Sequence, residues 1–368
     1  MSEDTKRYSY RKYLLAILET VYLLLILLVF LVSGLSKTLA EQLSMFLKRE
    51  YFLLPAYILA VSLGFYFLNF PLNFYHSFIL EHKFRLSNQN FKNWLFEQLE
   101  AAIISYLIAL MLVSAFYQIL KYYSSIWWLI ASLFWIILSL ILGKLLPTVI
   151  IPIFFKYRKL QDENLRSRLL TLAQKMGIKL LDCFEIDFSK KTVKANAAYV
   201  GMGSSKRVIL ADTLKDKYTN DEIEVIVAHE FAHHKLKHLF KLTFIDSQAT
   251  LIIFYLIFKT SPFVLKLFDL SSLSDIAALP VILIYFTLFA IIIQPFENYI
   301  SRYLERSADY LALKVTGKKE AFISMMDKLA LQNLADRTPH PLIKFFFFDH
   351  PPISERIKFA NSLIGQNN

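Results

Sequence analysis

The segment His229-Glu230-Phe231-Ala232-His233 holds two histidines four residues apart, with a glutamate directly after the first. On an α-helix, positions i and i+4 lie on the same face, so both imidazoles can reach one metal ion. Glu230 can then accept a proton from a water molecule that the metal activates. The segment contains neither Pro nor Gly and follows an apolar run, which favours a helix. This spacing predicts a hydrolytic zinc site.

A third ligand is needed, because a catalytic zinc has three protein ligands and one open position. His234 is turned about 100° from His233 on the helix, and His238 lies further round, so we interpret both as solvated or juxtamembrane histidines. Glu305 and Asp309 are a better pair, four residues apart on a predicted helix. In glutamate-ligand zinc peptidases, such a Glu binds the metal and the Asp orients the first histidine. We therefore predict Glu305 as the ligand; the alternative is a solvated charged face.

His350 is a third candidate for chemistry. It follows the aromatic run Phe345–Phe348 and precedes Pro351 and Pro352, which stiffen the backbone. Peptide hydrolysis develops negative charge on the carbonyl oxygen, and a histidine near the metal can stabilise that charge. The spacing fits equally well a His-Pro turn that ends one helix and caps the next, so both interpretations stay open here.

The composition indicates a membrane protein. Hydrophobic residues make up 56% of the 368 residues, against about 45–50% in soluble domains. The net charge of +11 gathers between the apolar runs, as expected for loops on the cytoplasmic side, and no basic stripe or zinc-finger spacing points to nucleic acid. The single cysteine, Cys183, excludes an intramolecular disulfide, and we interpret it as a small buried hydrophobic residue.

Six apolar stretches are each close to the ~20 residues that cross a bilayer. The first follows a basic N-terminus, is too long for a signal-peptide core and precedes no cleavage site, so we expect it to be retained. The fifth is the weakest, because it contains Lys241, Asp246 and Gln248. The predicted spans are 14–34, 52–71, 101–119, 126–148, 239–258 and 277–296.

Charge bias predicts the topology. With the basic N-terminus in the cytoplasm, the positive-inside rule places the 72–100 loop and the 155–238 block on the cytoplasmic side. Two spans separate that block from the C-terminal one, so both lie on the same side and can build one site. We predict four segments: N-terminal spans (1–154), a catalytic part with the two histidines (155–238), two further spans (239–296) and a catalytic part with the third ligand (297–368).

Short-range patterns predict the elements that position these residues. Helical periodicity covers Asp162–Met176, and Asp221 opens a second helix that continues into His229. Glycines and serines at 201–205 predict a hairpin turn. The predicted strands are Leu181–Ile186, Ala195–Val200 and Arg207–Leu210.

Several separated motifs follow one another in a characteristic order between about Pro71 and Ala360. With them the chain resembles the type 1 CAAX prenyl endopeptidases, integral-membrane zinc proteases that cleave beside an isoprenylated cysteine. The bacterial heat-shock membrane protease family HtpX shares the zinc motifs but has fewer spans. The motifs are Glu81-His82-Lys83-Phe84, Ser189-Lys190 through Asn196-Ala197, Arg207 through Leu214, His229 through His233, Ser301-Arg302 with Glu305 and Ala308-Asp309, and His350-Pro351-Pro352 with Glu355-Arg356.

The resemblance implies roles for these residues. It assigns the metal to His229, His233 and Glu305, the general base to Glu230, and the orienting carboxylate to Asp309. It implies that Asn196 and Ala197 hold an extended substrate at a strand edge, and that His350 and Arg302 lie near the reacting carbonyl. It also implies a water-filled chamber within the ring of spans, which Glu19, Asp246 and Gln248 would face.

Two departures from the eukaryotic pattern indicate a compact prokaryotic relative. We count six spans where eukaryotic members have seven, and the stretch between Leu214 and Asp221 is very short. These departures leave the substrate open, because a cell without protein prenylation has no CAAX substrate.

We therefore expect a mainly α polytopic membrane protein with a gluzincin-like zinc-protease domain that contains a small β element. The expected function is zinc-dependent endopeptidase activity near the C-terminus of prenylated peptides, with one zinc ion in a monomeric chain and the catalytic domain in the cytoplasm. The alternatives are a quality-control protease of the HtpX type and, outside the enzymes, a membrane transporter or chaperone.

Overall fold

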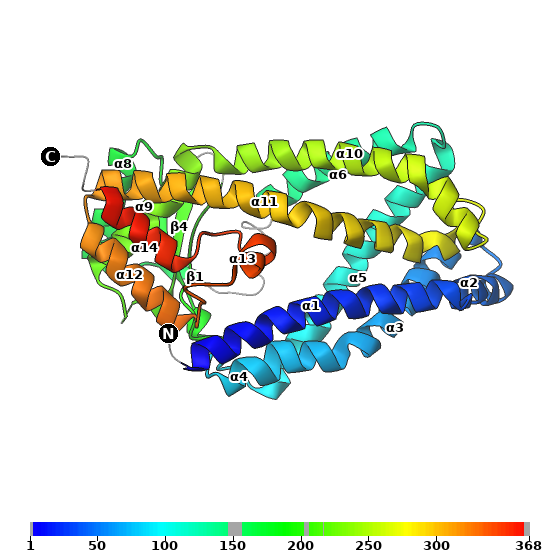
Figure 1. Cartoon of the computed structure of the whole chain (residues 1–368), viewed down its shortest axis with the longest axis horizontal. Helices are drawn as coiled ribbons and strands as arrows, with labels where there is room; N and C mark the ends of the chain where they lie inside the picture. The colour runs from blue at the N-terminus through cyan, green and yellow to red at the C-terminus, as the bar shows by residue number, and fades with distance from the viewer. Residues whose placement is uncertain (1–2, 146–156, 202–205, 216, 364–368) are drawn as a thin grey trace.

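A computed structural model describes residues 3–145, 157–201, 206–215 and 217–363. Long helices lie side by side along the molecule, and a smaller mixed domain sits at one end, with helix α2 at the opposite end (Figure 1). The helices are α1 Glu3–Val32, α2 Leu35–Phe46, α3 Glu50–Phe74, α4 Glu81–Lys83, α5 Phe91–Tyr122, α6 Trp127–Leu145, α8 Glu163–Lys175, α9 Asn220–Lys235, α10 His238–Leu267, α11 Leu279–Thr316, α12 Lys319–Gln332, α13 Pro341–Phe347 and α14 Ile353–Ser362.

Five helical segments of the described chain are long and apolar enough to cross a membrane: Glu3–Val32, Tyr51–Lys83, Phe91–Tyr122, His238–Leu267 and Ile276–Thr316. They coincide with five of the six predicted spans, including the weak fifth one. The remaining prediction, 126–148, falls on α6, whose apolar stretch Trp127–Gly143 is shorter. Its end, at 146–148, lies outside the described residues.

Helix α11 links the membrane part to the site. Its 38 residues correspond to about 57 Å at 1.5 Å per residue, almost twice the ~30 Å hydrocarbon thickness of a bilayer. The predicted boundary at 296/297 therefore lies inside one continuous helix. The part of α11 beyond the apolar stretch packs along α9 and carries Glu305 and Asp309 into the mixed domain.

The mixed domain contains a four-stranded sheet in the order β1-β2-β4-β3. Strand β2 is antiparallel to β1 and parallel to β4, and β3 is antiparallel to β4. The three predicted strands are confirmed within one to two residues at each end, and β1 was missed because three residues are too few to show a period. The strands are β1 Tyr157–Lys159, β2 Asp182–Ile186, β3 Ala197–Val200 and β4 Arg207–Ala211. Most of the predicted hairpin turn, 202–205, lies outside the described residues.

Helices α8 and α9 begin at recognisable caps. Asp162 accepts a hydrogen bond from the N–H of Leu165 at the start of α8. Thr219 and Glu222 form a reciprocal capping box that starts α9, one residue before the predicted start at Asp221. Buried side chains of α8, α9, α11, α12 and the sheet form one apolar core, in which Phe231 is fully buried. This core fixes α9 against α11.

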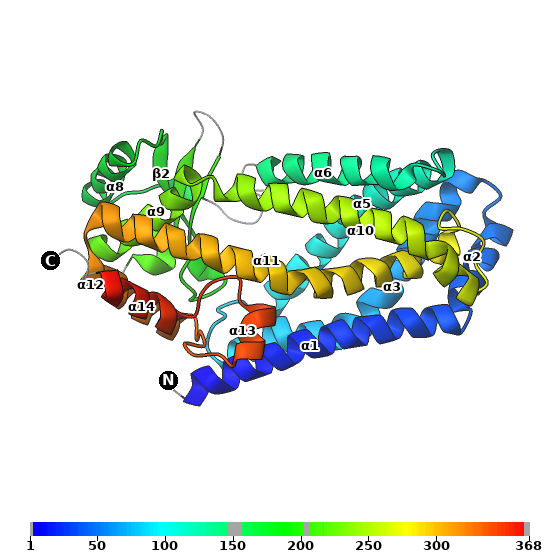
Figure 2. The same cartoon turned by 45° about the horizontal axis from the view of Figure 1, so that its top comes forward.

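The two soluble blocks of the chain meet at one end of the long helices. Two views show α8, α9 and the sheet from the first block beside α12 and α14 from the second (Figures 1 and 2). The prediction that both blocks can build one site is therefore confirmed.

Candidate metal centre and active site

Helix α9 presents His229 and His233 on one face, as the i, i+4 spacing predicts. Other sides of the helix are anchored in the core by Ala228, Phe231 and Ala232, all with no exposed surface. The Nε2 atoms of the two histidines lie 3.0 Å apart. The packing of the helix thus aims both rings at one point.

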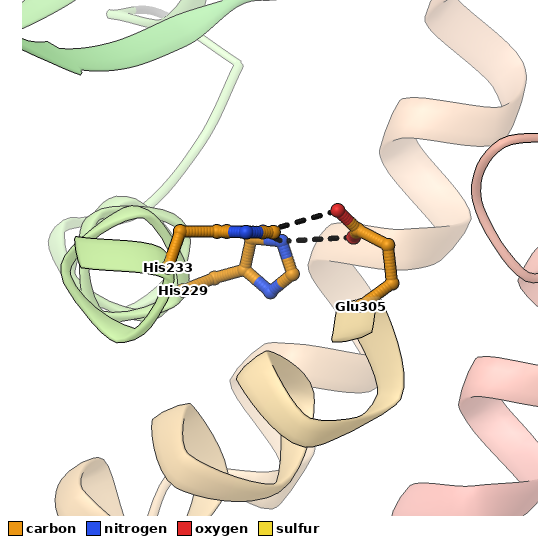
Figure 3. Close-up of side chains that lie close together, drawn as sticks. All are labelled: His229, His233 and Glu305. Carbon is orange, nitrogen blue, oxygen red and sulfur yellow. Dashed lines mark hydrogen bonds and ion pairs between the residues drawn. The ribbon is translucent and has the colours of Figure 1, made fainter. Parts of the chain in front are cut away.

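Glu305 reaches the same point from α11 (Figure 3). Its Oε2 lies 3.2 Å from Nε2 of His229, and its Oε1 lies 3.1 Å from Nε2 of His233. One ligand atom from each of the three residues falls within 4.8 Å of the others. His229 and Glu305 are 76 residues apart in the sequence. Only the fold brings together the two helices that carry them.

These three residues fit a metal ion. Nε2 of His229 and Nε2 of His233 lie 3.0 Å apart, close enough for both to bind one cation. Oε2 of Glu305 is buried and accepts no well-aligned hydrogen bond among the described residues; its neighbour is Nε2 of His229, at 3.2 Å, so a shared cation would satisfy both atoms. Two His nitrogens and one carboxylate form a donor set that leaves a fourth, open position, as in catalytic zinc sites.

Asp309 lies behind His229, on the side away from Glu305. Its Oδ1 is 2.9 Å from Nδ1 of His229, and the residue is 1% exposed. Arg356, from α14, donates to both carboxylate oxygens of Asp309, from Nε at 2.8 Å and Nη2 at 2.5 Å. Because Nδ1–H of His229 donates to Asp309, its Nε2 lone pair faces the metal position. The sequence contained Arg356 in a recognised motif but gave no sign that it contacts Asp309.

The prediction for His238 was wrong. We expected a solvated or juxtamembrane residue, but it is 1% exposed, and its Nδ1 lies 3.0 Å from Nδ1 of His233. Helix α9 ends at Lys235, and Lys237 adopts a left-handed conformation with φ 55°. The helical extrapolation fails because this turn redirects the chain and starts α10 at His238. His234 is exposed as expected.

The contacts of His238 fix the orientation of His233. Nε2 of His238 lies 3.1 Å from Oγ of Ser307, whose hydroxyl donates to the carbonyl of Leu304. With Nε2–H of His238 donating to Ser307, Nδ1 of His238 accepts from Nδ1–H of His233. The Nε2 lone pair of His233 is then directed at the metal position, as for His229.

Glu230 lines a cavity of about 150 Å³ beside the three residues. Burial raises the pKa of its carboxyl group, which suits a proton acceptor that later returns the proton. Burial lowers the pKa of His229, but its contacts with the carboxylates of Asp309 and Glu305 outweigh this and raise the pKa to about 9. Without a metal, His229 therefore holds a proton at neutral pH.

His350 also lines this cavity. Its Nε2 lies 3.4 Å from Oε1 of Glu305, and its Nδ1 lies 2.8 Å from Oδ1 of Asp349. Burial lowers its pKa, but the hydrogen bond to Asp349 and the charge of Glu305 raise it on balance. The side chain is 53% exposed, so a substrate can reach it. His350 therefore lies at the site, and it also lies in the turn that leads into α14.

The guanidinium group of Arg302 contacts the backbone of the segment that precedes His350. Its Nη1 donates to the carbonyl oxygens of Lys344, at 3.1 Å, and Phe348, at 2.5 Å. Both acceptors belong to the segment that leads to His350. These contacts hold that segment against α11.

Asn196 and Ala197 line the cavity at the start of β3. This strand forms one edge of the described sheet, next to the helix that carries His229 and His233. An extended peptide in the cavity can therefore lie beside a strand edge, as in β-strand addition.

Residues 159–364 match the profile of peptidase family M48, and these residues are more than half of the chain. The chain belongs to peptidase family M48. Residues 2–156 match a second profile, that of the CAAX prenyl protease N-terminal region with five membrane helices. Together the two profiles cover residues 2–156 and 159–364 of this M48 peptidase.

Relatives of this M48 peptidase extend over most of the chain. An uncharacterized metalloprotease of Bacillus subtilis, YhfN, is 31% identical over 336 residues, which cover 90% of this chain and 79% of the relative. CAAX prenyl protease 1 of Saccharomyces cerevisiae is 28% identical over 307 residues, which cover 78% of this chain and 67% of the relative. The resemblance deduced from the motifs is thereby confirmed.

The fold is that of a solved relative. The crystal structure of S. mikatae Ste24p matches with a TM-score of 0.87 at 23% identity, over 97% of this chain and 88% of that chain. The mainly helical fold with a small sheet is therefore confirmed. The family match, the relatives and the five long apolar helices of the described chain together identify the protein as a multi-pass membrane metalloendopeptidase.

Proposed function

We propose that this M48 peptidase is a zinc enzyme in which His229, His233 and Glu305 bind one zinc ion per chain. The observation that supports this most directly is the approach of the three ligand atoms to within 4.8 Å. The hydrogen bonds of His229 to Asp309 and of His233 to His238 also support it, because each orients an Nε2 lone pair toward the same point.

The proposed reaction is hydrolysis of a peptide bond by a water molecule. The chemistry that zinc supplies here is polarisation of the scissile carbonyl and a lower pKa for the attacking water. Glu230 takes the proton of that water and passes it to the leaving amine. The raised pKa of Glu230 supports both steps, because the carboxyl group has to accept and then release a proton near neutral pH.

His350 and Arg302 contribute in different ways to this proposal. His350 donates a hydrogen bond to the carbonyl oxygen as it gains negative charge, since its exposed ring stands at the cavity beside Glu305. Arg302 is a positioning residue, because its guanidinium group binds the backbone at Lys344 and Phe348. It keeps the segment before His350 in place.

The proposed substrate is an extended peptide that pairs with the edge of β3 at Asn196 and Ala197. CAAX prenyl protease 1 of Saccharomyces cerevisiae is a relative over most of this chain, which favours cleavage near the C-terminus of isoprenylated peptides. The charge bias of the loops favours a cytoplasmic catalytic domain. The proposal takes the active form to be a monomer. The four-segment division of the chain, 1–154, 155–238, 239–296 and 297–368, remains part of this proposal.

The test is cleavage of a fluorescent farnesylated C-terminal peptide and of its unprenylated twin by detergent-purified protein, with and without a zinc chelator. We expect chelator-sensitive cleavage of the farnesylated peptide. Equal cleavage of both peptides would keep the zinc peptidase and replace prenyl specificity with general membrane-protein proteolysis. Failure to cut either peptide with zinc bound would overturn the proposed activity.

A further inference from the structure

A cavity of about 520 Å³ opens between α11, α13 and α14. Figures 1 and 2 show α13 and α14 beside α11. Five residues of α11 and five of α14 line this cavity, together with Lys344 of α13. Of the described residues, only Arg356 lines both this cavity and the one at Glu230. Peptide hydrolysis at Glu230 needs no ligand here, so the lining of the cavity requires a separate explanation.

The side chains that line this cavity carry an excess of positive charge. Five cationic side chains stand against two carboxylates. Both carboxylates are already paired, Asp309 with Arg356 at 2.5 Å and Glu355 with Lys344 at 2.6 Å. The cations that remain are Arg302, Arg306 and Lys358.

Arg302 keeps its charge without a direct carboxylate partner. Its Nη1 donates to two backbone carbonyl oxygens, which are neutral acceptors. The charges of Glu355 and Asp349 act on it only from a distance, and each of these carboxylates is bound elsewhere, to Lys344 and His350. Even when Asp349 is counted with the cavity, the positive charges exceed the negative ones by two.

Arg306 and Lys358 form no ion pair within the described part of the chain. The guanidinium group of Arg306 lies over the ring of Phe359, 4.8 Å from its centroid. A guanidinium group held by its face still offers the N–H groups at its edge to an anion. Lys358, the neighbour of Phe359 on α14, is exposed. Both charges are therefore available to a ligand.

The cavity lies where the exposed apolar side of α11 ends. Ile292, Phe296, Tyr299 and Tyr303 are 59–71% exposed, and their spacing of three and four residues places them on one face of the helix. Tyr299 and Tyr303 also line the cavity. Tyrosines gather where a membrane span meets the lipid headgroups. A lipid molecule that packs against this face of α11 can therefore reach the cavity with its headgroup.

Helix α10 indicates the same level for the membrane surface. His238, the first residue of α10, lies 3.1 Å from Oγ of Ser307 on α11. The next two residues of α10, Leu239 and Phe240, are 73% and 71% exposed. Large apolar side chains on the outside of a membrane protein are expected to face the bilayer or its interface. The apolar surface thus extends to the level of Ser307, which is adjacent to Arg306.

We propose that this cavity binds the headgroup of an anionic phospholipid, whose phosphate contacts Arg302, Arg306 and Lys358. Phosphate oxygens accept strong hydrogen bonds from such cations, and basic pockets between helices at the membrane surface suit anionic headgroups. A zwitterionic headgroup brings a cation of its own, which the excess positive charge repels. The apolar face of α11, continuous with the cavity, favours a lipid over a soluble phosphate compound.

The bound lipid would connect two helices that build the metal site. Arg306 belongs to α11, which carries Asp309, and Lys358 belongs to α14, which carries Arg356. A phosphate between them holds α14 against α11 and so supports the contact of Arg356 with Asp309. This lipid site does not depend on the proposed peptide hydrolysis.

The experiment measures lipid binding to the detergent-purified, full-length protein. A fluorescent phosphatidylglycerol and a phosphatidylcholine with the same acyl chains and label are titrated, and anisotropy gives each Kd. We expect phosphatidylglycerol to bind about tenfold more tightly, the value of one charge-assisted hydrogen bond. The double variant Arg306→Gln with Lys358→Gln is expected to lose this preference, and Arg306→Lys with Lys358→Arg is expected to keep it.

The matched control is Lys217→Gln with Lys314→Gln, which removes the same charge at exposed positions outside the cavity. This control should keep the preference. Equal affinity of the wild-type protein for the two lipids, or an equal loss in both glutamine double variants, would overturn the site. Excess inorganic phosphate should leave lipid binding unchanged, and displacement of the lipid by phosphate would overturn the assignment to a lipid.

Discussion

Arg356 donates hydrogen bonds to both carboxylate oxygens of Asp309, from Nε to Oδ2 at 2.8 Å and from Nη2 to Oδ1 at 2.5 Å. The same carboxylate contacts Nδ1 of His229. Asp309 is 1% exposed, so its charge has little access to water. The arginine therefore makes it possible for a buried carboxylate to orient a metal ligand.

Replacement of Arg356 by Met is expected to leave Asp309 buried without its counter-charge. We expect a loss of about 3 kcal/mol in the free energy of unfolding and a fall in zinc affinity of roughly tenfold or more. Thermal unfolding in detergent and chelator competition measure the two effects. Arg337→Met serves as the control, because Arg337 pairs with the more exposed Asp327. Unchanged zinc affinity in Arg356→Met would contradict the orienting role.

The variant Glu230→Gln is expected to bind zinc as the wild type does and to lose activity by about 10²- to 10⁴-fold, because the amide cannot accept a proton. Metal content by mass spectrometry and peptide cleavage at substrate saturation give the two readouts. Retained turnover would rule out Glu230 as the base.

His238→Phe keeps a ring of similar size and removes the acceptor for Nδ1–H of His233. Because the imidazole of His233 loses the partner that orients it, we expect zinc affinity to fall on the order of tenfold. The neighbouring variant His234→Phe is the control, since His234 is exposed and pairs with Lys206. Equal affinities for the two variants would argue against a role for His238.

Zinc binding to the metal-free protein at pH 7 is expected to release a proton from His229. Its pKa of about 9 lies above the assay pH, so the ring is protonated before zinc binds and neutral afterwards. Zinc affinity should accordingly fall as the pH is lowered. Calorimetric titrations in buffers of different ionisation enthalpy count the protons. In Asp309→Asn the pKa is expected to fall, and with it the number of protons released; an unchanged number would contradict the assignment.

Ala197→Pro tests the strand edge. The N–H of Ala197 faces the free edge of β3, where Pro is tolerated, so the fold and the zinc content should be retained. We expect kcat/KM to fall about tenfold, because one hydrogen bond to the substrate is lost. Ala198→Pro is the matched contrast: its N–H faces Ile209 across the ladder, so this variant should lose stability. Full activity of Ala197→Pro would exclude substrate pairing at this residue.

The sequence by itself determined the features that depend on short-range periodicity and composition. The i, i+4 spacing placed His229 and His233 on one face of a helix, and five of the predicted spans fall on long apolar helices. Strands β2, β3 and β4 were located because alternation and turn residues act over a few positions. These signals are local, so they can be recognised in the sequence without knowledge of the fold.

Only the tertiary structure decided which distant groups meet. Glu305 was a candidate ligand on spacing alone, and the packing of α11 along α9 brought it to the two histidines. The left-handed turn at Lys237 buried His238 against His233, where helical extrapolation placed it in solvent. The contacts of Arg356 with Asp309 and of Asn333 with Ala195 join segments whose separation carries no periodic signal. Such contacts depend on how helices and strands pack, and no local pattern encodes them.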